Sequence, residues 1–162
     1  MAIVLARVDD RLLHGQVVVA WRRVLAFDTV YVIDDGVAGD PYLVDTLRLA
    51  APSDLQVRAL SVVEATAALA DPPSGRAILL FKTPQAALAL VEAGVSLPGL
   101  NVGNLAWGAG RKRVQRSIAL SAEEAEVLER LSARGVQVTF QQAPEERAVG
   151  WEVVRRKVKD GA

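Results

Sequence analysis

Short apolar runs alternate with amphipathic stretches along nearly the whole chain. Residues 2–6 and 77–81 are almost wholly apolar, and residues 29–33 are β-branched and aromatic, which is typical of buried strands. Residues 55–60 alternate between apolar and polar, as a half-buried or edge strand does. Further strands are predicted at 99–103 and 136–140, with a short one near 117–120.

The stretches between these strands carry helix signals. Ser61 with Glu64, and Ser121 with Glu124, have the spacing of a capping box. Helices are predicted at 17–25, 40–50, 61–70, 85–93 and 121–133, with a weakly helical tail at 145–159 anchored by Trp151 and Val154. Turns or loops are predicted at 34–36, 71–75 and 104–113.

Strands that alternate with helices over short loops predict an α/β fold in three layers. The sheet is expected to be open and mostly parallel, with helices on both faces, and one antiparallel strand near the C-terminus fits the pattern. The 162 residues favour a single domain, 1–162, with a full-sized core. No internal repeat, low-complexity segment or interdomain linker divides the sequence.

Composition narrows the class of protein. Hydrophobic residues make up 51% and charged residues 23%, the profile of an ordinary globular protein. Lys+Arg and Asp+Glu are 19 each, so the net charge gives no indication of nucleic acid or a membrane surface, and local charge must carry any recognition. The absence of cysteine excludes disulfides and thiolate metal sites. Without a signal-peptide pattern or an apolar run near ~20 residues, the protein is expected in the cytoplasm.

His14 is the only histidine, and it stands where the first strand gives way to the first helix. In open α/β sheets, ligands and chemistry gather at the carboxyl ends of the strands. A neutral imidazole is a competent nucleophile, and the helix N-terminus after it favours a phosphate. Gly15 allows the backbone to come close to an anion, and Arg11 supplies a charged fork. The alternative is a histidine that merely caps the helix or fills the loop.

Asp9 and Asp10 leave several interpretations open. They can pair with Arg7 and Arg11, orient His14, or hold a metal. Pairing is favoured, because opposite charges that alternate along a loop usually neutralise each other. A metal is not expected, because there is no further histidine to complete a zinc site.

A glycine-rich stretch and a basic run follow the fifth strand. Gly103 and Gly108 resemble the start of a P-loop, but Ala109 and Gly110 replace the required Lys and Ser/Thr, so no nucleotide is expected. The basic residues at 111–113 fit either an anion or partner surface or a solvated loop. A receiver-like module is a further alternative, although the third strand ends at 60–61 without the aspartate that it requires.

One motif indicates a family. The first loop closely resembles the signature of the mannose/fructose/sorbose-type enzyme IIB of the bacterial sugar phosphotransferase system: Arg7-Val8-Asp9-Asp10-Arg11-Leu12-Leu13-His14-Gly15-Gln16-Val17. Trp21 falls where that family often has tryptophan. The likeness continues through 35–40, 80–84, 100–103 and 131–136, and so covers the chain to about residue 140. Gly108 and Ala109 depart from the arginine and glutamine that often follow the aromatic residue, and 141–144 and the tail match poorly.

The resemblance implies a mechanism. His14 would take a phosphoryl group on Nδ1 from a phosphohistidine of a IIA protein and pass it to a sugar held by the membrane components IIC and IID. In catalysis, Arg11 would neutralise the phosphoryl oxygens and Asp10 would position either Arg11 or the imidazole. Arg11, Gly15 and Gln16 would bind the phosphate. Contacts of the site loops or of partners would come from Asp35, Lys82, Thr83, Asn104 and Arg111. No metal, nucleotide or other cofactor is needed, because the donor is already a phosphohistidine.

The resemblance also sets expectations for fold and cellular role. It implies a parallel sheet with the strand order 3-2-4-1-5-6, which would place the loops of His14, Lys82 and Asn104 side by side. The protein would be cytoplasmic and would associate peripherally with the membrane components. A regulatory or receiver-like phospho-signalling protein without sugar transport is the alternative. The sequence does not name the sugar and leaves open a homo-oligomer.

Overall fold

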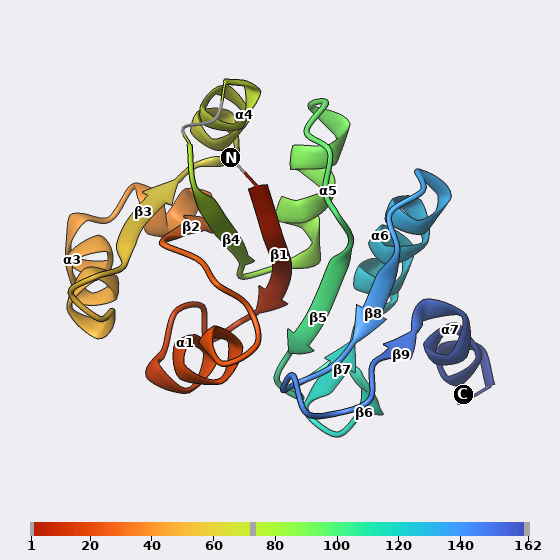
Figure 1. The fold of residues 1–162 in the computed structure, drawn as a ribbon. Helices are drawn as coiled ribbons and strands as arrows, with labels where there is room; N and C mark the ends of the chain where they lie inside the picture. The colour runs from red at the N-terminus through yellow and green to blue at the C-terminus, as the bar shows by residue number, and fades with distance from the viewer. Residues whose placement is uncertain (1, 72–73, 161–162) are drawn as a thin grey trace.

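Seven strands form one sheet in the order β3-β2-β4-β1-β5-β8-β9 (Figure 1). The computed structural model describes residues 2–71 and 74–160, so the predicted break at 72–73 lies outside the described residues. The strands of this sheet are β1 Ala2–Asp9, β2 Thr29–Ile33, β3 Gln56–Leu60, β4 Arg76–Phe81, β5 Leu100–Asn104, β8 Val138–Phe140 and β9 Val149–Gly150. All pairings are parallel except β8–β9, which is antiparallel. The predicted α/β class, the antiparallel strand near the C-terminus and the implied strand order are confirmed.

Helices cover both faces of the sheet. They are α1 Gly15–Arg22, α2 Asp35–Ala38, α3 Pro41–Ala50, α4 Val62–Ala70, α5 Pro84–Glu92, α6 Ala122–Ala133 and α7 Trp151–Asp160. Successive residues of a strand point to opposite faces, so Val30 and Val32 pack with α1 whereas Tyr31 and Ile33 pack with α4 and its neighbours. Trp151 belongs to the same hydrophobic cluster as Tyr31 and Ile33, and it anchors α7 there, as predicted. In the described chain, none of the helices is long and apolar enough to span a membrane.

Local signals placed most elements correctly. Both predicted capping boxes form, with Ser61 and Ser121 accepting hydrogen bonds from the backbone N–H groups of Glu64 and Glu124. The predicted turn at 34–36 is instead the short helix α2, because the Asp34 side chain accepts a hydrogen bond from Val37 N.

The loop predicted at 104–113 also contains unexpected structure. Its end belongs to a small antiparallel hairpin, β6 Lys112–Gln115 with β7 Ile118–Leu120. β7 is the short strand predicted near 117–120, whereas β6 was missed, because half of its residues are charged and only Val114 is buried. β1 is longer than predicted and extends into the polar motif as far as Asp9.

Arg7 joins the middle of the sheet to the C-terminal third of the chain. The side chain is completely buried. Its Nη1 donates to Asn101 Oδ1 at 2.6 Å and to the carbonyl of Gln141 at 2.9 Å, while Nη2 donates to the carbonyl of Gln142 at 2.8 Å. The guanidinium lies directly over Gly103, where a Cβ would overlap it. The close approach of the Arg7 guanidinium therefore explains why residue 103 is a glycine, and a P-loop is not needed to explain it.

We expect Gly103→Ala to destabilise the fold. The added methyl would displace a buried guanidinium from its partners, and overpacking of this kind costs about 1–3 kcal/mol. Denaturant unfolding measures the loss. Gly108→Ala is the matched control, because nothing lies within 4 Å of a Cβ built at residue 108. Equal unfolding midpoints for the two variants would contradict this role of Gly103.

Candidate functional site

The carboxyl end of β1 turns sharply before α1 begins. Leu12 N donates to the carbonyl of Asp9 at 2.9 Å, and Arg11 N donates to Asp9 Oδ1 at 3.0 Å. Leu12 has a φ of 56°, the left-handed region that side chains rarely adopt, and its side chain is buried. His14 then takes the N-cap position of α1 in extended conformation. This turn places the imidazole at the end of the central strand, as the sequence indicated.

Asp9 is the buried centre of the site. Its carboxylate accepts from Arg7 Nη2 at 3.2 Å, from Arg11 Nε at 3.0 Å and from Arg11 Nη2 at 2.9 Å. The same Oδ2 lies 3.9 Å from His14 Nε2. Asp9 is completely buried, whereas the side chain of Arg11 is 36% exposed. One carboxylate therefore holds two arginines and faces the imidazole, and Arg11 still reaches solvent.

Asp10 has different partners. Its Oδ1 accepts from Asn104 Nδ2 at 2.7 Å, and its Oδ2 accepts from Ala106 N at 2.8 Å. The expectation that Asp10 positions Arg11 or the imidazole is thus corrected: Asp9 holds Arg11, and Asp10 fixes the loop after β5. The sequence could not separate the two acids, because both stand within two residues of an arginine.

The surroundings of His14 keep its imidazole neutral. Burial lowers the pKa of His14 below the ordinary value of 6.5, and the charges of Arg11 and Arg7 lower it further. Asp9 acts in the opposite direction and raises that pKa, but the net shift is downward. Nε2 is buried and finds no hydrogen-bond partner within the described residues. A neutral imidazole is the nucleophilic form, so the site favours attack near neutral pH.

An open hollow lies beside the imidazole. It has a volume of about 190 Å³ and is lined by Arg11, His14, Val17, Ala20, Trp21, Gln142, Ala143, Glu145 and Glu146. The first N–H groups of α1 have no intrahelical acceptor, which makes this end of the helix suited to an anion. Gly15 is exposed with open space around it, and the side chain of Gln16 lies outside what the structure describes.

Three further expected residues lie at the same edge of the sheet. β4 and β5 flank β1, with Val8 opposite Phe81 and Asp9 opposite Asn104. The loops that carry Lys82 and Asn104 therefore adjoin that of His14, as expected. Lys82 is exposed, whereas Thr83 caps α5 by accepting from Ala86 N at 3.3 Å.

Two other expected residues are engaged elsewhere. Asp35 accepts from Val62 N at 2.9 Å and so caps the start of α4, beyond β2. Arg111 donates to Glu124 Oε1 at 3.0 Å and Oε2 at 2.9 Å, and to the carbonyl of Ala106 at 3.0 Å. Its guanidinium holds the loop after β5 to the start of α6. Neither contact brings these side chains to His14.

The segment at 141–146 was missed as part of the site. Its carbonyls accept from Arg7, and its residues Gln142, Glu145 and Glu146 close one side of the hollow. No spacing or composition in the sequence indicated this, because the contact is made by backbone carbonyls far from the motif. In the motif, Arg7 is the residue that makes these contacts, but from its sequence position it is equally consistent with a charge on the surface.

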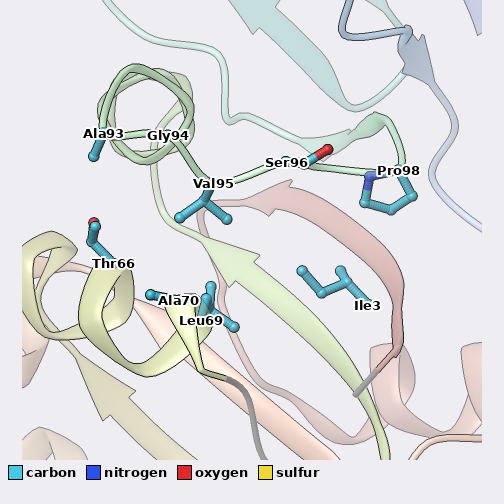
Figure 2. Close-up of a pocket in the computed structure, with 9 residues that line it drawn as sticks. All are labelled: Ile3, Thr66, Leu69, Ala70, Ala93, Gly94, Val95, Ser96 and Pro98. Atoms are coloured by element: carbon cyan, nitrogen blue, oxygen red, sulfur yellow. The ribbon is translucent and has the colours of Figure 1, made fainter.

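A larger cavity lies at the opposite end of the sheet. It has a volume of about 490 Å³ and opens between the C-terminal ends of α4 and α5 and the start of β1, as Figure 2 shows. Most of its lining residues have apolar side chains, Thr66 and Ser96 contribute hydroxyl groups, and none of the lining side chains is ionisable. The volume of a cavity alone therefore does not identify the candidate functional site.

Comparisons with known proteins agree on one family. A family model described as PTS system sorbose subfamily IIB component matches residues 3–160. The fructose-specific EIIB component of Bacillus subtilis is 32% identical over 160 residues, covering 98% of each chain. The sorbose-specific EIIB component of Klebsiella pneumoniae is 33% identical over 140 residues, covering 85% of each. The crystal structure of the IIBSor domain of the sorbose permease from Klebsiella pneumoniae superposes with a TM-score of 0.90 at 30% identity, covering 100% of this chain and 99% of that one.

The pKa of His14 can be measured directly, because no other histidine contributes imidazole resonances. We expect an NMR titration midpoint below 6.5. In Arg11→Gln the midpoint should rise, because a repelling charge is removed while Asp9 still attracts the protonated ring. Arg23→Gln, an exposed substitution at the other end of α1, should leave the midpoint unchanged. A midpoint at or above 6.5 in the unsubstituted protein would refute this electrostatic account.

Proposed function

The chain belongs to the sorbose subfamily of IIB components of the sugar phosphotransferase system (PTS), the phosphocarriers of sugar uptake, and we propose that His14 is its phosphoryl carrier. The observation that carries the proposal is the position of the imidazole. It stands at the N-terminus of α1, beside a hollow, with Asp9 behind it and Arg11 at its side.

Nδ1 is the nitrogen that we assign to the attack. Nε2 is buried and faces the Asp9 carboxylate at 3.9 Å, which favours the tautomer with the proton on Nε2. The lone pair then resides on Nδ1. Attack forms an N–P bond there as the N–P bond of the IIA phosphohistidine breaks. The phosphorylated ring gains positive charge, and Asp9 stabilises it.

Arg11 and the helix N-terminus supply the positive field for the transfer. Phosphoryl transfer depends on alignment and on stabilising charge spread over the equatorial oxygens. The backbone N–H groups at Gly15 and Gln16 begin α1 and precede its first complete turn. Arg11 is held by Asp9 through two bonds and remains partly exposed toward the hollow. We assign Asp10 to positioning the loop after β5, which borders the same edge.

The family sets the partners of the reaction. A IIB component implies IIA and IIC/IID partners. We propose that residues 1–162 form a single IIB-type domain that receives the phosphoryl group from IIA in the cytoplasm. It would then deliver the group to a sugar at the membrane components. No metal or nucleotide enters this scheme; within residues 2–71 and 74–160, no His, Asp and Glu side chains gather in a group able to hold a metal ion.

His14→Ala should abolish phosphorylation by phospho-IIA and leave the unfolding midpoint nearly unchanged, because the ring makes no hydrogen bond among the described residues. The label on the unsubstituted protein should be lost in mild acid and kept in strong base. Protonation makes the nitrogen of a P–N bond a good leaving group, whereas hydroxide attacks the carbonyl of an acyl phosphate. Base-labile label that persists in His14→Ala would move the chemistry to an aspartate.

Arg11→Gln should slow transfer far more than it weakens the fold. Loss of one charged donor to a developing phosphoryl charge lowers the rate by about 10²–10³-fold. The free energy of unfolding should change by at most about 1 kcal/mol, because the side chain is 36% exposed and Asp9 keeps Arg7. Single-turnover transfer and denaturant unfolding measure the two effects, with Arg23→Gln as control. Normal transfer with a large loss of stability would make Arg11 structural.

A further inference from the structure

Two neighbouring elements, α7 and the β6–β7 hairpin, are rich in basic residues, none of which is assigned to catalysis. The hairpin contributes Lys112, Arg113 and Arg116, and α7 contributes Arg156, Lys157 and Lys159. These six residues are called the basic patch below. The chain as a whole has no net charge, so this gathering is a segregation of charge and does not follow from composition.

Packing holds the two elements of the basic patch together. Trp151 and Val154 are buried and fix one side of α7, with the ring of Trp151 stacked on Phe140 at 6.0 Å between centroids. Lys157 Nζ donates to the carbonyl of Val114 at 3.1 Å, and Lys112 Nζ donates to the carbonyl of Lys157 at 2.6 Å. The ammonium groups thus bond to carbonyls, which do not cancel their charges.

Few acidic groups oppose this charge. Arg113, Arg116, Arg156 and Lys159 are all exposed, and no salt bridge involves them among the described residues. Glu152 is the exposed acid on α7, one turn before Arg156, and Asp160 ends the helix. Arg155 pairs with Glu129 and is left out of the patch for that reason. Glu146 shares a small hollow with Arg116, and the six basic residues of the patch outnumber these three acids, Glu146, Glu152 and Asp160.

The basic patch adjoins the end of the molecule that carries His14. Figure 1 shows the hairpin and α7 at the end of the sheet toward which β1 and β5 point, the same end as α1. Arg116 lines a small hollow of about 60 Å³ together with Glu146, and Glu146 also lines the hollow of His14. A surface bound at the patch would therefore face the same end of the molecule as His14.

We infer that the basic patch binds the anionic headgroups of the membrane in which IIC and IID reside. Protein interfaces typically have an aromatic or apolar centre, although arginine is common in them. Here the exposed large apolar side chain on α7 is Val153 alone, surrounded by charge. Clusters of four to eight lysines and arginines instead suit an anionic bilayer, where each strengthens binding by about fivefold. The inference rests on family membership and does not require that His14 be the carrier.

Vesicle binding tests the inference on the full chain. We expect co-sedimentation with phosphatidylcholine vesicles that contain phosphatidylglycerol, none with pure phosphatidylcholine, and release as salt shortens the Debye length. The quadruple substitution of Arg113→Gln, Arg116→Gln, Arg156→Gln and Lys159→Gln should weaken binding by at least about tenfold. The matched control removes four exposed arginines elsewhere: Arg23→Gln, Arg48→Gln, Arg130→Gln and Arg134→Gln.

Each outcome is decisive. Retained binding of the control, with loss in the patch variant, supports the inference. Equal loss in both would show that net charge alone attracts the protein, and absence of binding to anionic vesicles would overturn the inference outright. Phosphorylation by soluble phospho-IIA should be the same in the patch variant and the unsubstituted protein. A patch variant that accepts phosphate slowly, with no vesicle binding by either protein, would instead assign the surface to IIA.

Discussion

A buried arginine needs partners for its charge, and the Nη1 and Nη2 groups of Arg7 obtain them from three separate parts of the chain. Asp9 supplies the opposite charge, Asn101 supplies an amide oxygen, and residues 141–142 supply two carbonyls. Burial lowers the pKa of the guanidinium, whereas its contact with Asp9 raises that pKa. Removal of one partner from such a buried pair is strongly destabilising, because the other charge is left without compensation. The position of Asp9, and through it Arg11 and His14, depends on this arrangement.

The two adjacent acids of the motif, Asp9 and Asp10, have different roles because they face different parts of the structure. Asp9 faces Arg7, Arg11 and the imidazole, whereas Asp10 faces the loop that follows β5. One carboxylate thereby orients Arg11 beside the histidine, and the other fixes the neighbouring loop. Asp9 is shared between two cations, so Arg11 is oriented without being fully neutralised or enclosed. A partly exposed, pre-oriented guanidinium is what a transient phosphate requires.

The fold was largely predictable because its signals are local. Apolar runs placed the parallel strands, and Ser61 and Ser121 marked the starts of two helices. His14, Arg11, Lys82 and Asn104 were expected at one edge, and the register of β4, β1 and β5 puts their loops there. What escaped prediction depends on contacts distant in sequence. Neither residue type nor spacing indicates that Asp9, rather than Asp10, holds Arg11. The same is true of the pairing of Arg111 with Glu124 and of the carbonyls of 141–142 as acceptors for Arg7.

The bonds from Arg7 to Gln141 and Gln142 span 134 and 135 positions of sequence. During synthesis, β1 leaves the ribosome long before the carbonyls that complete the shell of its arginine. A growing chain can pair β1 with β4 and then with β5 while that cation still lacks its last partners. Loops of this length close late, because their entropy must be overcome before the contact stabilises them. The surroundings of Arg7, and with them the candidate site, are thus completed only after residues 141–142 have been made, although Arg7 is among the first residues to be made.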